Sequence, residues 1–169
     1  GLIEWKNLGD LGVNDVIAIH RTTDFWPDTQ VEVFKYHTSP GPYGNPLTLP
    51  DVVNERWGLL LGYLVGDGSW TVRTGIDMTV AHDETKREVK DLYTELLGSY
   101  KVKGEKRRLG STVEQIHFHS KHLREFLHHL GFRYDVKSHT KTTPWVILQS
   151  PKPVVRAYLQ GLFETDGFV

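Results

Sequence analysis

The stretch "LLLGYLVGDGSW", Leu59 to Trp70, begins as an apolar helix and ends with an aspartate between two glycines. Glycine often terminates helices and Asp-Gly is a common turn, so the stretch alone predicts only a helix followed by a turn. A second copy, "LQGLFETDG" at 159–167, repeats the glycine, the apolar pair and the closing Asp-Gly. Its Asp166 lies 99 residues after Asp67 (166 minus 67). The doubled pattern predicts two related helices, each ending in a carboxylate.

Small residues recur four positions apart in both copies. Gly62 and Gly66 lie on one helix face, and Gly161 and Thr165 have the same spacing. Side chains this small let two helix backbones approach closely, which would bring both helix ends together. An alternative is that the glycines only relieve crowding in a core, at a cost of about 1 kcal/mol each in helix stability.

The composition describes a packed globular chain. Of 169 residues, 38% are hydrophobic, enough for one domain or one domain and part of another. No apolar run approaches the roughly 20 residues that span a membrane, and the N-terminus lacks the pattern of a secretory signal. There are no cysteines, which excludes disulfides and thiolate chemistry and is typical of a cytoplasmic protein.

Charge is unevenly distributed although the net charge is only −1. Residues 1–56 hold four Lys or Arg against eight Asp or Glu. The stretch "KVKGEKRR" at 101–108 instead carries five positive charges and one negative charge. Such a local basic stripe suits a nucleic-acid groove, and a solvated hairpin is the alternative.

Proline and glycine divide the chain. Residues 39–50, "SPGPYGNPLTLP", hold four of the eight prolines and predict a linker. It separates an N-terminal piece, 1–38, from the main domain, 51–169. Within the first piece "NDVIAIH" at 14–20 has the composition of a short strand.

The main domain alternates helices and strands. A helix is expected from about 51–55 to 66, strands at 69–73 and 76–82, and an amphipathic helix at 83–98, capped by Asp83 and ended by Gly98. A hairpin from 101–109 and 112–120 follows, then a helix capped by Ser120 and ended by Gly131. The order predicts an α+β fold with helices on one face of an antiparallel sheet.

Residues 55–169 resemble the LAGLIDADG homing endonucleases through the paired motifs. The resemblance implies an αββαββα repeat plus the second motif helix, with the two motif helices side by side. It also implies a site-specific double-stranded DNA endonuclease that hydrolyses phosphodiester bonds and leaves a staggered break. Asp67 and Asp166 would bind the divalent metal, Mg²⁺. Glu164 takes the place of the family's first acid but Val65 does not, so Glu164 is not taken as catalytic.

Physical chemistry favours a metal at such helix ends. A carboxylate at a helix C-terminus is unfavourable by some tenths of a kcal/mol, and a second carboxylate nearby adds repulsion. Bound Mg²⁺, which prefers hard oxygen ligands, would offset both effects. "KTTPW" at 141–145 also resembles a Lys-x-x-Pro element of the intein-encoded members. Lys141 lies 25 residues before Asp166 (166 minus 141), and the resemblance implies that it reaches the active site as a catalytic cation.

Strand alternation predicts which residues face a partner of the sheet. The residues expected to face DNA are Ser69, Thr71, Arg73, Asp77, Thr79, Gln115, His117 and His119. The residues expected to contact phosphates are Lys103, Lys106, Arg107 and Arg108. His117 and His119 could instead form a metal pair, but no third ligand is apparent in the sequence.

"IEWKNLGDLGVNDVIAIHR" at 3–21 resembles a segment of an intein splicing domain. Splicing by this chain is not expected, since it has no cysteine and ends without a His-Asn pair. We therefore expect 1–38 to be a splicing-domain remnant and the chain to be an internal portion of a monomeric two-repeat endonuclease. The second repeat's sheet is then absent, and this fragment alone should bind a half-site weakly and cleave poorly.

Two other functions remain open. One is a non-cleaving LAGLIDADG-type module that binds nucleic acid, as an RNA maturase or a transcription regulator. The other is a small-molecule enzyme with "GDGSW" as a phosphate loop. The second is disfavoured because the glycine spacings of the known phosphate loops are missing and the stretch follows a helix instead of a strand.

Overall fold

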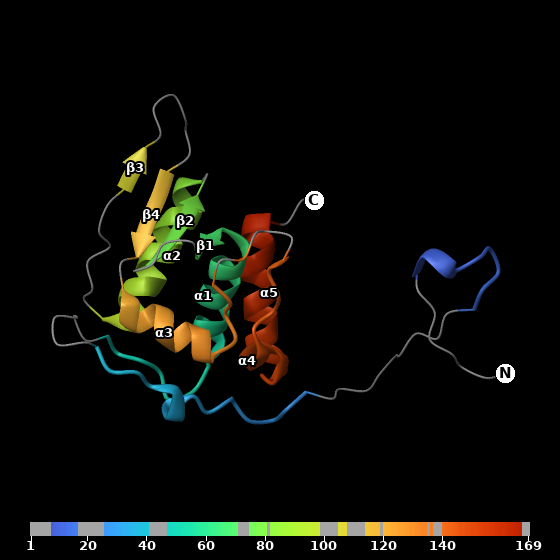
Figure 1. The fold of residues 1–169 in the computed structure, drawn as a ribbon, viewed down its shortest axis with the longest axis horizontal. Helices are drawn as coiled ribbons and strands as arrows, with labels where there is room; N and C mark the ends of the chain where they lie inside the picture. The colour runs from blue at the N-terminus through green and yellow to red at the C-terminus, as the bar shows by residue number, and fades with distance from the viewer. Residues whose placement is uncertain are drawn as a thin grey trace.

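The computed structural model describes residues 8–16, 26–40, 47–70, 75–80, 82–98, 105–107, 114–118, 120–134, 136 and 140–166. The fold is α+β, as predicted (Figure 1). The helices are α1 (Glu55–Gly66), α2 (Asp83–Leu97), α3 (Lys121–His129), α4 (Trp145–Leu148) and α5 (Lys152–Asp166). The strands are β1 (Gly68–Ser69), β2 (Ile76–Val80), β3 (Glu105–Arg107) and β4 (Glu114–Phe118). Leu8–Asp10 and Phe34–Tyr36 form short 3₁₀ helices.

The four strands form an antiparallel sheet in the order β1-β2-β4-β3. Burial alternates along β2: Ile76, Met78 and Val80 are buried, whereas Asp77 is half-buried and Thr79 is exposed. On the buried face Tyr93 of α2 stacks on Phe118 of β4, with ring centroids 4.2 Å apart. One face of the sheet is therefore covered by apolar packing while the other is more open, as the alternation predicts.

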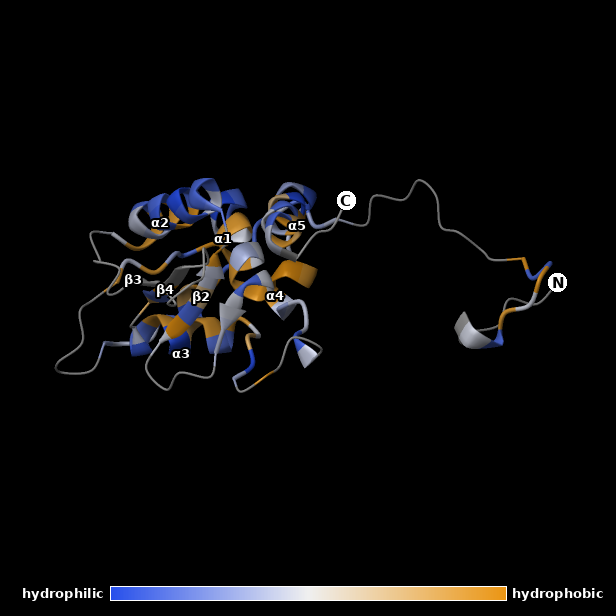
Figure 2. Ribbon diagram, turned by 90° about the horizontal axis from the view of Figure 1, so that it is seen from above, coloured by the Kyte–Doolittle hydropathy of each residue, from blue (hydrophilic) through white to orange (hydrophobic). Residues whose placement is uncertain are grey.

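Helix α1 lies between α2 and α5 (Figures 1 and 2). The side chain of Asn54 caps its start by accepting a hydrogen bond from the Trp57 amide at 3.0 Å. Every residue from Trp57 to Gly66 is buried. An apolar sequence on all sides suits a helix that is surrounded on all sides.

Helix α2 is amphipathic, and its hydrophilic side faces outward (Figure 2). It ends at Gly98, whose φ of +82° favours glycine, as expected. The predicted cap by Asp83 is wrong, because Asp83 is already the first helical residue and His82 takes the cap position without a side-chain hydrogen bond. In the first turn the Asp83 carboxylate still interacts favourably with the helix dipole.

Helix α3 is capped as predicted, since the Ser120 hydroxyl accepts a hydrogen bond from the Leu123 amide at 3.0 Å. Gly131, at φ +106°, follows its last turn. A feature not predicted is Arg124, which is buried on this helix. Its guanidinium donates to the Trp70 carbonyl at 3.1 Å and lies 4.0 Å from the centre of the Tyr134 ring. Arg124 therefore fixes the chain just after β1.

The second motif helix is longer than the motif. Helix α5 begins at Lys152, before the repeat at 159–167 starts, and the short α4 precedes it. Residues 167–169 lie outside the described part of the chain. No described helix has the length and apolar character needed to cross a membrane.

The segment before the expected linker packs against the main domain. Val33 is completely buried, and Glu32 pairs with Val52 in an isolated β-bridge. The Thr38 hydroxyl donates to the His122 carbonyl at 3.2 Å, and the His122 ring lies 2.5 Å from the Thr38 carbonyl oxygen. The domain boundary at 38 stays a prediction, but side-chain and backbone contacts cross it.

The linker itself is described at 39–40 and 47–50, where it forms neither helix nor strand. Its Leu47 is nevertheless buried in the core. Of the strand expected at 14–20, only 14–16 are described, and they form no strand.

Candidate active site at two paired helix ends

Helices α1 and α5 pack backbone against backbone. A Cβ atom at Gly58 would lie only 2.6 Å from the carbonyl oxygen of Val154, and one at Gly62 would overlap the carbonyl oxygen of Tyr158. From the other side, a Cβ at Gly161 would overlap the Leu59 carbonyl oxygen. These two helices make the most extensive contact between any two elements of the described chain. The close helix approach predicted from the glycine spacing is thus confirmed.

The crossing extends to the last turn of both helices. A Cβ at Gly66 would overlap the hydroxyl oxygen of Thr165, so these two residues lie directly against each other. The Thr165 hydroxyl hydrogen-bonds back to its own helix, at 2.9 Å from the Leu162 carbonyl oxygen. Gly66 and Thr165 are the residues immediately before Asp67 and Asp166. The packing therefore brings the chain positions of both acids to the same junction.

Asp67 is the C-cap of α1 and is half-buried. Its amide donates to the Tyr63 carbonyl at 3.1 Å, and its own carbonyl accepts from the Thr79 amide at 3.4 Å. Gly68 then lets the chain turn into β1, since a Cβ there would overlap the Leu64 carbonyl oxygen. Asp67 thus stands where the helix meets the sheet. Asp166 is the last residue of α5, and its side chain lies outside the described part.

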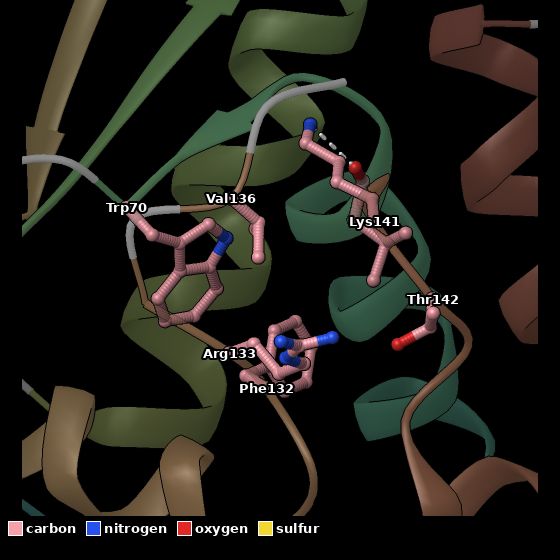
Figure 3. Close-up of a pocket in the computed structure, with 7 residues that line it drawn as sticks. Trp70, Phe132, Arg133, Val136, Lys141 and Thr142 are labelled. Atoms are coloured by element: carbon pink, nitrogen blue, oxygen red, sulfur yellow. Dashed lines mark hydrogen bonds between the residues drawn. The ribbon is translucent and has the colours of Figure 1, made fainter. Parts of the chain in front are cut away.

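Lys141 reaches the same helix end from the loop before α4. Its ammonium donates to the carbonyl oxygen of Val65 at 2.7 Å (Figure 3) and to that of Gly66 at 2.6 Å. These are terminal carbonyls of α1, which have no partner within the helix. A cation at this place also interacts favourably with the helix dipole. The family resemblance implied that Lys141 reaches the candidate site, but not that it binds the backbone of α1.

A small pocket lies beside this contact. It is lined by Val65, Trp70, Phe132, Arg133, Val136, Lys141 and Thr142 (Figure 3). Trp70 and Phe132 pack together with ring centroids 4.7 Å apart. Arg133 is exposed and lies beside Phe132 in the lining of the same pocket (Figure 3). Nothing in the sequence pattern singled out Arg133, because it lies in the turn after α3 and outside every motif.

The more open face of the sheet carries a histidine–aspartate pair. Asp77 of β2 and His117 of β4 are register partners, and their side chains meet at 2.5 Å between Nδ1 and Oδ1. The exposed fractions of the two side chains are 14% for His117 and 22% for Asp77. Both residues were expected to face DNA, and here they also contact each other. Their opposite positions in two adjacent strands were the signal that sequence reasoning missed.

Other residues expected to contact DNA are only partly described. Thr79 is exposed and Ser69 is half-buried. Lys106, Arg107 and Gln115 lie on β3 and β4, but their side chains are outside the described part. The remaining expected contacts lie outside the described residues: Thr71, Arg73, Lys103, Arg108 and His119. The DNA-contact set stays a prediction.

The donor chemistry at the helix ends fits a hard divalent cation. Asp67 supplies a carboxylate at the junction, and the chain position of a second carboxylate, Asp166, adjoins it through the Gly66–Thr165 contact. Mg²⁺ keeps several waters and needs only one or two protein carboxylates. Among the described side chains no group of three His, Cys, Asp or Glu forms a metal site, a set that does not include the Asp166 side chain.

A hydrogen bond joins α1 to α2. The Tyr63 hydroxyl donates to Glu88 at 2.6 Å. Burial raises the pKa of Tyr63 above its ordinary value, and the hydrogen bond to Glu88 raises it further. Glu164 on α5 is exposed. Glu88 belongs to α2 and Glu164 to α5, so neither residue is part of the last turn of α1, where the candidate site lies.

Comparison with known proteins gives a partial relationship to a curated protein. No family model matches the chain. An A-type ATP synthase subunit of Pyrococcus abyssi (strain GE5 / Orsay) is 32% identical to it over 125 residues. The match covers 74% of this chain and 12% of that protein, so the chain spans about an eighth of the length of this curated relative.

Proposed function

We propose that the chain belongs to a site-specific double-stranded DNA endonuclease of the LAGLIDADG type, carried by an intein and acting in intein homing. The observation that supports this most directly is the contact between Gly66 and Thr165, because it joins two helix ends that each continue into an aspartate. The product would be a staggered double-strand break made by metal-dependent phosphodiester hydrolysis.

In this proposal Asp67 and Asp166 hold Mg²⁺ at the junction of α1 and α5. When bound, the cation would polarise the scissile phosphate and help ionise the attacking water. The protein itself holds the two metal-binding residues in place. The glycine-lined crossing fixes the separation of the helix ends, and the backbone hydrogen bonds of Asp67 to Tyr63 and Thr79 fix the start of its side chain.

The sheet would supply the DNA surface. Its apolar residues are buried on one face, so Thr79, Asp77 and His117 are on the face left to meet a partner. Polar side chains of this kind can contact base edges and phosphates in a major groove. The basic stripe at 101–108, followed along the chain by β4, would add phosphate contacts.

The relationship to the ATP synthase protein is compatible with an inserted element. A segment amounting to 12% of a longer protein is what an element carried inside host proteins would share with another carrier. This chain contains no G-x-x-x-x-G-K-[ST] pattern, so a nucleotide-hydrolysing role for the shared segment has no support in its residues. The proposed location is the cytoplasm, and the proposed complete protein is a monomer with two repeats.

Substituting one aspartate tests the proposal. The complete protein that carries this segment is incubated with a library of randomised duplex DNA and Mg²⁺, and cleaved molecules are sequenced. Asp67→Asn should abolish cleavage while DNA binding persists. The matched control is Glu164→Gln, which neutralises an exposed acid two residues before Asp166 and should cleave as wild type.

Each contrary result has a definite meaning. Unchanged cleavage by Asp67→Asn would remove the metal assignment. Binding of DNA or RNA without cleavage by the wild-type protein would favour the non-cleaving module instead. The 169-residue chain alone is expected to cleave poorly, so vigorous specific cleavage by it at low concentration would refute its proposed status as an impaired fragment.

A further inference from the structure

The ammonium of Lys141 is directed at the backbone of the helix that ends in Asp67. Two of its three N–H groups donate to the carbonyls of Val65 and Gly66, at 2.7 and 2.6 Å. Lys141 is half-buried, which limits the water that could compete for these bonds. A lysine that acted on a phosphate would need those donors for the phosphate oxygens.

The end of α1 has two electrostatic problems that this contact relieves. Its last carbonyls have no partner within the helix, and the Asp67 carboxylate follows the negative end of the helix dipole. A lysine ammonium satisfies the carbonyls and brings a positive charge to the same end. The contact spans 75 residues of sequence, so it also anchors the loop before α4 over the last turn of α1.

We propose that Lys141 is a positioning residue: it fixes the last turn of α1, and through it the placement of Asp67 and the metal affinity of the site. This rests on the proposed function of Asp67 as a metal ligand. It differs from the direct catalytic role that the family resemblance implies for this lysine. Lys141 then acts before the chemical step, by holding the ligand in place.

The two roles predict different losses. Without the ammonium, the Val65 and Gly66 carbonyls lose a hydrogen-bond donor. The repulsion between the Asp67 carboxylate and the negative end of the α1 dipole is then no longer reduced by the Lys141 charge. Groups that support a metal ligand typically contribute about 10- to 100-fold to metal affinity. A positioning role therefore predicts a large rise in the metal concentration needed, with the rate at saturating metal largely kept. A direct catalytic role instead predicts an unchanged metal requirement and a large loss of rate at saturating metal.

The experiment compares Lys141→Met and Lys141→Arg with the control Lys152→Met, an exposed lysine at the opposite end of α5. Binding of Mn²⁺ to the 169-residue chain is followed by the electron paramagnetic resonance of free Mn²⁺. Amide hydrogen exchange is measured at 63–67. Cleavage by the complete protein is measured against Mg²⁺ concentration.

Lys141→Met should bind Mn²⁺ about 10- to 100-fold more weakly and exchange faster at the Asp67 amide. Its cleavage rate should recover at high Mg²⁺. Lys141→Arg retains donors for the carbonyls and should stay close to wild type in both measurements, which keeps the test decisive if the methionine variant folds poorly. Lys152→Met should leave both unchanged.

Two outcomes would overturn the role. Wild-type Mn²⁺ affinity in Lys141→Met, with a cleavage rate that high Mg²⁺ does not restore, would make Lys141 a direct participant in the reaction. A fall in melting temperature without any change in Mn²⁺ affinity would leave it only structural. If the wild-type chain and Asp67→Asn bind Mn²⁺ equally, the proposed metal function itself fails, and this result differs from both of the others.

Discussion

Gly66 and Thr165 are packed so closely that a methyl group on Gly66 would occupy the position of the Thr165 hydroxyl. Each of these residues is followed by an aspartate. The distance between Asp67 and Asp166 therefore depends on this contact, which leaves no room for a side chain at position 66. A change of one methyl group at this contact should move the helix ends apart.

Adding a methyl group at the centre of the crossing should destabilise the fold. In an unobstructed helix Gly62→Ala would gain about 1 kcal/mol of stability. Here the new Cβ overlaps the Tyr158 carbonyl oxygen, and overpacking costs about 1–3 kcal/mol. We expect a net loss in the free energy of unfolding by urea. Thr94→Ala, at an exposed position of α2, should change stability little, and a stabilised Gly62→Ala protein would contradict the close crossing.

Removing the Tyr63 hydroxyl should weaken the attachment of α1 to α2. Tyr63→Phe takes away the donor to Glu88 and should cost about 1.5–3 kcal/mol at neutral pH, the range for a hydrogen bond to a charged group. Urea unfolding measures the change. Equal stability of the two proteins would show that water replaces the lost hydroxyl without cost.

The same tyrosine predicts a loss of stability at alkaline pH. Burial, then the hydrogen bond to Glu88, raises the pKa of Tyr63 in the folded protein. The folded state thus holds the proton more tightly than the unfolded chain, so this contribution is complete below pH about 10 and is lost as pH rises above it. Tyr63→Phe should show a shallower alkaline decline. Some decline should remain, because burial also raises the pKa of Tyr134 and Tyr158.

The segment before the linker should contribute to the stability of the main domain. Val33 is fully buried, so Val33→Ala should lower the unfolding free energy by about 1–2 kcal/mol. Val16 is 97% exposed and provides the matched control, since Val16→Ala should be neutral. If Val33→Ala were also neutral, the segment would be independent of the main domain.

Metal should stabilise the chain through Asp67. A ligand that binds only the folded state raises stability by RT ln(1 + [L]/Kd), about 2.7 kcal/mol at 100 times Kd. The melting temperature of the wild-type chain should therefore rise with Mn²⁺ concentration. Asp67→Asn should show little rise.

Much of the architecture follows from local sequence patterns. The burial of Val89, Leu92 and Leu97 was predictable because helical periodicity alone sets which side of α2 is apolar. The Gly62 and Gly161 contacts were predictable because small residues four positions apart, present in both matching helices, allow the two backbones to approach closely. In both cases the pattern that allows the prediction extends over only a few turns of one helix.

The contacts that escaped prediction join residues distant in sequence. Lys141 lies 75 and 76 residues from its carbonyl partners, and Arg124 lies 54 residues from the Trp70 carbonyl. Backbone carbonyls have no sequence signature, so a side chain that binds one cannot be recognised from its neighbours. The Asp77–His117 contact needed the strand register, which depends on the whole sheet.

The α1–α5 crossing also bears on how the protein is made. Asp166 leaves the ribosome 99 residues after Asp67 (166 minus 67), a delay of about 5–20 s at a synthesis rate of about 5–20 residues per second. Until then the glycine face of α1 has no partner helix, and the two acids cannot meet. A nascent chain released early would carry the first acid without the second, and so would be unable to assemble the site that we propose.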